Sequence, residues 1–327
     1  MRTYARYIPQ LKRRETWPET VLRVVTHMRT VVNLSPEDAK GIHDAILRQE
    51  VLPSMRYMQF AGPAVDRNNL TIYNCSYLTI DSLESFHDAM YLLMCGVGVG
   101  FSAEEYMVRS LPAVTMTNSG TVHQYAIQDN KESWAAALLF GLECWVSGTD
   151  VVFNYDAIRK KGERLHTMGG RASGPAPLRE LLDFARERLF VRKEQWTPIL
   201  VMHVVCKIGQ IVVSGSTRRS ALICLSDLDD ETIARAKTGD WFLENPHFSQ
   251  ANISAVYNKV PSLKEFQWEW NILANSGSGE RGIFNRFNAI QSMPKKRREA
   301  MSEYKGSYPD VYGVFRDGDF SILGEGE

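Results

Sequence analysis

Residues 55–101, MRYMQFAGPAVDRNNLTIYNCSYLTIDSLESFHDAMYLLMCGVGVGF, contain the strongest fold signals of this 327-residue chain. A β-prone run around Cys75 ends at Asp81 and Ser82, which are residue types typical of a helix N-terminus. Apolar residues then recur at helical spacing until Gly96, where a glycine-rich turn begins. This order predicts a thiol at a strand end, followed by a helix, in an α/β fold with parallel strands.

The rest of the chain continues this alternation of helices and short buried strands. Helical spacing of apolar residues predicts helices over residues 17–51, 131–146, 198–213 and 227–237. A further helix is expected to begin at a capping box, residues 262–265. A short apolar run at residues 221–225 predicts a strand, so the alternation holds along most of the chain.

Composition narrows the class of protein. Apolar residues make up 44% and charged residues 23% of the chain, which is the profile of a soluble globular protein. Lysine plus arginine equals aspartate plus glutamate at 38 each, so no net field would attract nucleic acid or an anionic membrane. No stretch reaches the roughly 20 apolar residues of a membrane span, and the first residues lack the apolar core of a signal peptide.

The cysteines indicate a reducing compartment. They lie far apart, with no CxxC pair and no His/Cys spacing that fits zinc, so no metal site is expected. Their odd number in a long chain argues against a secreted disulfide framework, and we expect a cytoplasmic protein. The five positions are Cys75, Cys95, Cys144, Cys206 and Cys224.

Cys75 has the most suggestive surroundings of the five. Its neighbours Asn74, Ser76 and Tyr77 are polar enough to form the wall of a site. A thiol reacts as its thiolate, and exchange needs a second thiol within reach. The alternative reading is that Cys75 is a small core residue.

Three other segments could carry chemistry. Residues 95–101 are as rich in glycine as a phosphate-binding loop, but they follow a helix instead of preceding one, so close backbone packing is the alternative. Glycines and arginines in residues 162–175, and the Arg218-Arg219 turn, could bind the phosphates of a nucleotide or be solvated loops. The polar turn at residues 278–286 fits an active-site edge and a buried salt bridge equally well.

Taken together, several blocks resemble the adenosylcobalamin-dependent (class II) ribonucleotide reductases, in that family's order and over roughly residues 4–286. The blocks are MQFAGPA, YNCSYL, DSLESF, LMCGVGVGFS, GERLHTMGGRASGPAPL, RRSALICLSD, NISAVY and SGERGIFNR. The resemblance implies a ten-stranded α/β barrel made of two parallel five-stranded halves. Residues 1–52 would form an N-terminal helical region, and residues 53–327 the first half-barrel with its effector and specificity loops.

The resemblance also implies roles for single residues. By its position in YNCSYL, Cys75 corresponds to one member of the redox pair that reduces the ribose. The substrate-binding residues that it implies are Phe60, Ala61, Gly62, Pro63, Asn74 and Ser76. The effector and specificity residues that it implies are Asp81, Ser82, Gly169, Gly170, Arg171, Ser216, Thr217, Arg218 and Arg219.

The implied reaction is the reduction of ribonucleotides to 2′-deoxyribonucleotides for DNA synthesis. A thiyl radical, generated with adenosylcobalamin, abstracts the 3′-hydrogen, and the cysteine pair supplies two electrons and becomes a disulfide. The expected partners are a ribonucleotide substrate, a dNTP effector and a thioredoxin-like reductant, but neither nucleic acid nor a membrane.

The chain also departs from that family's pattern. No cysteine follows Cys224, so we expect the radical cysteine and the partner of Cys75 on a separate C-terminal half, which would also bind most of the cobalamin. A split or truncated gene would explain this, and the isolated chain is then expected to be inactive. The rival hypotheses are a non-catalytic dNTP-binding regulatory fragment and a nonfunctional remnant.

Overall fold

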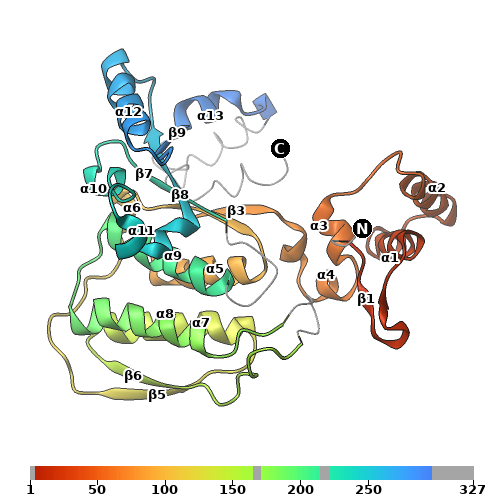
Figure 1. Ribbon diagram of the computed structural model, residues 1–327, viewed down its shortest axis with the longest axis horizontal. Coiled ribbons are helices and arrows are strands. Elements are labelled where there is room, and N and C mark those ends of the chain that lie inside the picture. Colours follow the sequence, from red (N-terminus) through yellow and green to blue (C-terminus); the bar gives the residue numbers. More distant parts are fainter. Residues whose placement is uncertain (1–3, 165–170, 214–220, 297–327) are drawn as a thin grey trace. The chain divides into compact units, whose positions relative to one another are not determined.

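The computed structural model describes residues 4–164, 171–213 and 221–296, and these divide into two compact units (Figure 1). The first unit comprises residues 1–74 with 164–169, and the second comprises residues 75–163 with 170–327. The domain boundary expected at residue 52 lies inside the first unit and stays a prediction. Gly169, Gly170 and Ser216 to Arg219, six of the expected effector residues, lie outside the described residues.

The first unit is mainly helical. Its helices are α1 (Trp17–Val32), α2 (Pro36–Leu47), α3 (Met55–Phe60) and α4 (Pro63–Arg67), with short 3-10 turns η1 (Pro9–Leu11) and η2 (Asn69–Ile72) and the antiparallel pair β1 (Tyr7–Ile8) and β2 (Arg13–Arg14). Thr16 and Glu19 form a capping box at α1, and Ser35 caps α2. The helical prediction for residues 17–51 is confirmed as two helices, with α2 beginning at the expected Ser35 cap, and Asn33 ends α1 by adopting a left-handed conformation.

The second unit is built on a five-stranded sheet. Its strands are β3 (Cys75–Thr79), β4 (Gly98–Ser102), β7 (Leu222–Asp227), β8 (Ala251–Tyr257) and β9 (Gly282–Asn285), in the order β3-β4-β7-β8-β9. All four neighbouring pairs are parallel. The α/β class with a five-stranded parallel sheet is therefore confirmed, whereas its place in a ten-stranded barrel is a matter of proposal.

The remaining elements of this unit connect and cover the sheet. They are α5 (Leu83–Met94), α6 (Glu105–Val108), β5 (Val122–Ala126), α7 (Lys131–Val146), β6 (Asp150–Asn154), α8 (Ala176–Arg186), the π-helical turn η3 (Glu187–Val191), α9 (Pro198–Val213), α10 (Glu231–Ala234), α11 (Trp241–Glu244), the 3-10 turn η4 (Pro246–Gln250), α12 (Leu263–Asn275) and α13 (Arg286–Ser292). Strands β5 and β6 form a separate parallel pair.

Local sequence signals place most of these helices correctly. The predictions for residues 131–146 and 198–213 are confirmed, and Ser262 with Glu265 forms the expected capping box of α12. The helix expected over residues 227–237 is wrong in extent, since only α10 is helical there. Asp227 still belongs to strand β7, and Asp230 caps α10, so the helix cannot begin earlier.

The core of the second unit lies on one side of the sheet. Helices α5 and α9 pack against that face, α7 and α8 lie beyond them, and the β5–β6 pair packs on α7 (Figure 1). Alternate strand residues supply the sheet's share of this core, among them Val99, Phe101, Cys224 and Ile253. Within the parts of the chain that the structure describes, no helix has the length and apolar character needed to cross a bilayer.

Candidate functional site

Cys75 is the first residue of β3, and its side chain is exposed. The alternative interpretation of Cys75 as a small core residue is therefore wrong. The other four cysteines are buried. Burial raises the pKa of the Cys144 thiol, raises that of Cys206 to about 12 and raises that of Cys224 well above its ordinary value. Because the thiolate is the reactive form, Cys144, Cys206 and Cys224 are poor nucleophiles.

The sheet face that carries Cys75 is the one opposite the helical core. Side chains alternate along a strand, so Cys75 and Tyr77 share a face with Gly98 and Gly100 of β4, their partners in register. Gly100 allows the Tyr77 ring to lie flat on β4, because a Cβ at this position would stand 3.1 Å from Tyr77 Cδ2. Residues 98–102 are thus an interior strand of the sheet, and the Tyr77 ring approaches its backbone closely. The interpretation of this glycine-rich run as a phosphate-binding loop is wrong.

Within the described ranges, the same face is also partly exposed on the neighbouring strands. Ile223 of β7 is 46% exposed, although β7 lies between two other strands. Asn252 of β8 is in register with Ile223 and is exposed, and Ser254 and Gly282 beside it are half-buried. Strands of a parallel sheet are normally covered on both faces, so this polar, glycine-rich face is suited to a polar ligand or to another layer of chain.

Sequence reasoning missed this open face. Asn252 and Ser254 interrupt an otherwise apolar strand, and asparagine is uncommon in strands. That interruption was the available signal. The sequence alone could not show that Asn252 and Cys75 share a face, because their strands β8 and β3 are distant in sequence and the strand order was needed.

The carboxyl ends of the strands are held by a buried ion pair. Arg286, directly after β9, donates to both oxygens of Glu104, two residues after the end of β4, at 2.9 and 2.6 Å. Ser102 donates to the same carboxylate at 2.7 Å, and Asn258 accepts from Arg286 at 2.8 Å. Burial, with Glu104 as a second cause, raises the pKa of Tyr77. The phenol therefore stays protonated on the Cys75 face.

A second buried ion pair lies in the polar turn at residues 278–286. Arg281 donates to Glu269 of α12 at 2.7 and 2.9 Å and also to the carbonyl of Asp227. Of the two readings left open for this turn, the buried salt bridge is confirmed. The turn ties α12 to the end of β7.

The expected effector residues Asp81 and Ser82 lie where β3 passes into α5. Asp81 accepts hydrogen bonds from Thr79 at 3.0 Å and from Ser85 at 3.2 Å. Ser82 is the N-cap of α5, and its hydroxyl lies 3.2 Å from that of Ser85 without capping the helix backbone. Three hydroxyls and one carboxylate thus gather at the start of α5.

Arg171 is the other expected effector residue that the structure describes. It is exposed, and its guanidinium donates to the carbonyl of Gly162 at 2.7 Å. The backbones of Gly162 and Ala172 are also bonded, at 2.9 Å. Arg171 and Ala172 are therefore bonded to Gly162.

The expected substrate wall belongs to the first unit. Phe60 and Ala61 are buried, so only their backbone could face a ligand. Their carbonyls accept hydrogen bonds from Arg6 at 2.7 Å and from Arg23 at 3.0 Å, respectively. Gly62 is half-buried and precedes Pro63, which begins α4. Two arginines thus hold the backbone of this segment, and its role as a substrate wall stays a prediction.

Asn74 and Ser76 flank Cys75 in sequence and are both engaged in hydrogen bonds. Asn74, in the first unit, accepts from Arg56 at 3.1 Å. Ser76, in the second, donates to the carbonyl of Gly98 at 3.1 Å. The structure thus brings Cys75 and Ser76 together on β3 and places the wall and Asn74 in the other unit.

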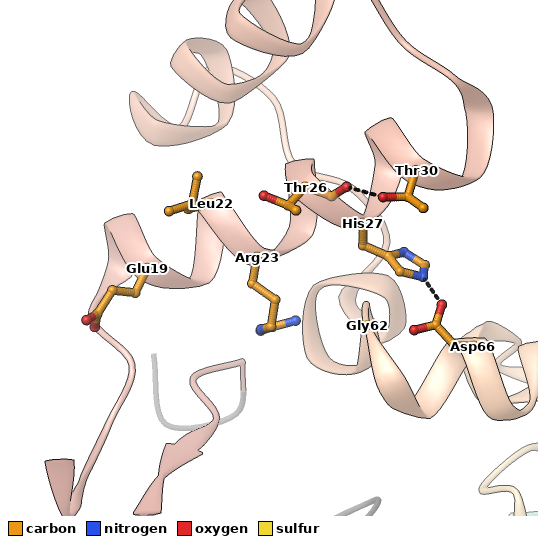
Figure 2. A pocket seen from close by; sticks show the side chains of 8 residues that line it. All are labelled: Glu19, Leu22, Arg23, Thr26, His27, Thr30, Gly62 and Asp66. Carbon is orange, nitrogen blue, oxygen red and sulfur yellow. Dashed lines mark hydrogen bonds and ion pairs between the residues drawn. The ribbon is translucent and has the colours of Figure 1, made fainter. Parts of the chain in front are cut away.

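The first unit also contains an open pocket of about 420 Å³ between α1 and α4 (Figure 2). Its lining includes His27, whose ring is held by Asp66 at 3.0 Å and by the Tyr57 hydroxyl at 2.6 Å. Gly62 links this pocket to the expected wall. Among the described residues, no three or more His, Cys, Asp or Glu side chains are placed to hold a metal ion.

Comparison with known proteins finds similar proteins whose descriptions all name a B12-dependent reductase. A family model described as "B12-dependent ribonucleotide reductase, insertion domain" matches residues 104–187. Two relatives share the name "Adenosylcobalamin-dependent ribonucleoside-triphosphate reductase". The protein from Lacticaseibacillus paracasei is 27% identical, over 98% of this chain and 52% of its own length. The protein from Euglena gracilis is 28% identical, over 80% of this chain and 38% of its own.

The fold has a solved counterpart. The crystal structure of a B12-dependent (class II) ribonucleotide reductase matches with a TM-score of 0.66 and 22% sequence identity. The match covers 78% of this chain and 45% of the other, and at this identity it supports the fold alone. The chain spans about half the length, or less, of these relatives.

Proposed function

Since the chain is a relative of the B12-dependent (class II) ribonucleotide reductases, we propose that it supplies part of an enzyme that reduces ribonucleotides to 2′-deoxyribonucleotides. The observation that carries the proposal is the exposed thiol of Cys75 on the open face of the parallel sheet. The names of the relatives favour ribonucleoside triphosphates as substrates.

In this proposal Cys75 is one of two thiols that reduce the ribose. A thiyl radical first abstracts the 3′-hydrogen. The 2′-hydroxyl then leaves as water, two thiols supply two electrons and two hydrogens, and a disulfide forms between their sulfurs. The radical cysteine finally returns the abstracted hydrogen to C3′, and its thiyl radical is restored. A thioredoxin-like reductant restores the thiols. The other four cysteines are buried, so the second thiol and the radical cysteine would come from polypeptide outside these 327 residues.

We further propose that the sheet is the first half of a ten-stranded barrel. Its open face, with Gly98, Gly100, Ile223 and Asn252, would then line the barrel interior. Among the described residues, the part of this face near the strand starts is exposed, and this supports the idea, because parallel sheets are normally buried on both sides. The missing cover would be the second half-barrel and the bound ribonucleotide.

The remaining site residues receive roles on the same basis. Phe60 to Pro63, with Asn74 and Ser76, would bind the substrate, the buried members through their backbone. Asp81 and Ser82, at the start of the 12-residue helix α5, would bind the dNTP effector together with Arg171 and the expected residues outside the described ranges. The Ser82 and Ser85 hydroxyls and the positive end of the helix dipole support a phosphate-bearing ligand there.

Adenosylcobalamin is the cofactor named for the relatives. The α1–α4 pocket of about 420 Å³ does not fit it, because pockets of 300–1,000 Å³ already hold drug-sized ligands and a corrin with its nucleotide is larger. We propose instead that the separate C-terminal half binds most of the cofactor, as the resemblance implies. When bound, the cofactor would supply the radical.

Complementation tests the proposal. The chain would be co-expressed with the C-terminal half of a class II reductase, which carries the radical cysteine and the second redox cysteine, and assayed for deoxyribonucleotide formation with adenosylcobalamin and a dithiol. We expect activity from the pair, none from either piece, and loss of turnover in Cys75→Ser with retained dNTP binding. Cys144→Ser, a buried thiol away from the open face, is the matched control.

Two results would contradict the proposal. Full turnover by the Cys75→Ser pair would remove Cys75 from the redox chemistry. Binding of dNTPs by the isolated chain, with no activity from any C-terminal half, would favour a non-catalytic regulatory fragment instead.

A further inference from the structure

A buried cysteine and a lysine meet where helix α5 ends and helix α7 begins. Cys95 is the C-cap of α5, and Lys131 is the first residue of α7. Lys131 Nζ donates to Cys95 Sγ at 2.9 Å. Cys95 is 0% exposed, whereas Lys131 is half-buried.

The surroundings hold the amine on the sulfur. Lys131 Nζ lies 4.7 Å from the centroid of the Tyr91 ring, one turn before Cys95 on α5. Within the described ranges, Lys131 forms no ion pair with a carboxylate, which is the usual partner of a lysine. Sulfur and aromatic face are thus the groups that fix the position of this nitrogen.

We propose that Cys95 and Lys131 are a peroxide-sensitive pair that forms a reversible N–O–S cross-link. The 2.9 Å separation is close to that of two atoms joined through one bridging oxygen, so the bond needs little movement of the helices. The flexible four-carbon stem of lysine can supply the rest. This inference does not depend on the proposed reductase function.

The chemistry balances with hydrogen peroxide as the oxidant. One peroxide converts the Cys95 thiol to a sulfenic acid and releases one water. A second peroxide takes the hydrogen of the sulfenic acid and one hydrogen of the neutral Lys131 amine, and the peroxide is thereby reduced to two waters. The sulfenic oxygen then bonds to the lysine nitrogen. Reduction by dithiols, with four electrons and four protons, returns the thiol, the amine and one water.

The link would act next to the proposed redox site. It closes the chain between residues 95 and 131, which contains all of β4. Gly98, the first residue of β4, is in register with Cys75. Cross-linking α5 to α7 is therefore expected to restrict the start of β4 and to stabilise the fold by reducing the entropy of the unfolded chain.

Mass spectrometry of the purified chain tests the inference directly. The chain would be treated with hydrogen peroxide, digested without reductant and searched for the Cys95 and Lys131 peptides joined together. We expect a joined species with the mass of both peptides plus one oxygen minus two hydrogens, which dithiothreitol resolves into the unmodified peptides. The oxidised chain should also show a thermal midpoint a few degrees higher, and the shift should disappear on reduction.

The variants separate this pair from other thiols. Cys95→Ser and Lys131→Arg should each abolish the joined species, whereas Cys144→Ser should leave it unchanged. Oxidation of Cys95 to a sulfinic acid with Lys131 unmodified would overturn the inference, as would an unmodified Cys95 in a sample whose exposed Cys75 is fully oxidised. The wild-type measurement decides even where a variant fails to fold.

Discussion

Arg281 and Glu269 are both 0% exposed and bond to each other through two contacts. Removing one partner leaves the other as an uncompensated buried charge, which costs about 3–5 kcal/mol. We therefore expect Glu269→Ala to lower the free energy of unfolding by about that amount, measured by urea denaturation.

Two comparisons sharpen this test. The double variant Glu269→Leu with Arg281→Leu should be more stable than Glu269→Ala, because it buries no charge. Asp44→Ala, which breaks the exposed pair with Lys40, should leave the unfolding free energy nearly unchanged. Equal losses in the single and double variants would show that shape, and not charge, stabilises this turn.

His203 and His247 form a second buried polar pair, with Nδ1 and Nε2 of the two rings 2.8 Å apart. Burial lowers the pKa of His203 to about 3 and that of His247 to about 4, and the nearby cations Arg188 and Lys207 add to the effect. The unfolded chain binds protons below pH 6.5 while the folded chain does not. Stability is therefore complete above pH 6.5 and is lost as the pH falls toward 4.

The expected loss is up to about 2–3 kcal/mol per pH unit for the pair within that window. Urea denaturation at several pH values would measure it. His247→Phe should flatten the dependence, and His123→Gln, at an exposed position, should not. A steep acid loss that persists in His247→Phe would assign it to carboxylates instead.

At the scale of elements, the turn after α7 depends on one glycine. Gly148 has a φ of +82°, and a Cβ there would overlap the carbonyl oxygen of Thr117. Gly239 also has a positive φ, +63°, but open space around it. Gly239→Ala should cost about 1–2 kcal/mol for the left-handed backbone alone. Gly148→Ala should cost clearly more.

Thermal unfolding of the two glycine variants checks this difference. Both residues follow helical segments, so the comparison isolates the steric overlap from the backbone conformation. Equal midpoints would mean that the segment at Thr117 shifts freely. In that case the β5–β6 pair would be less firmly attached to α7 than the backbone contacts indicate.

At the scale of the whole molecule, the charges balance at 38 of each sign. The chain also exposes apolar residues on α12, among them Phe266, Trp268 and Trp270. A protein with no net charge lacks the repulsion that opposes association. We expect light scattering to show the lowest solubility near neutral pH, with recovery on either side. Trp270→Lys should raise solubility at neutral pH, and an unchanged value would place the association elsewhere.

Local signals in the sequence were enough for the class of fold and for most elements. The helix at residues 131–146, the cap at Ser35 and the capping box at Ser262 depend on contacts within a few residues, so their patterns can be read directly. The sequence blocks around Cys75 likewise indicate the reductase relatives by residue identity alone. These features are determined by short stretches of chain.

Long-range pairing decided the rest. Strand order made residues 98–102 a central strand, placed Asn252 on the open face with Cys75 and buried Arg281 and Arg286 as ion pairs. The side to which a strand residue points depends on register, and register is set by partners distant in the sequence. For the same reason, spacing alone left Cys75 either exposed or buried, and the tertiary structure placed it in the open.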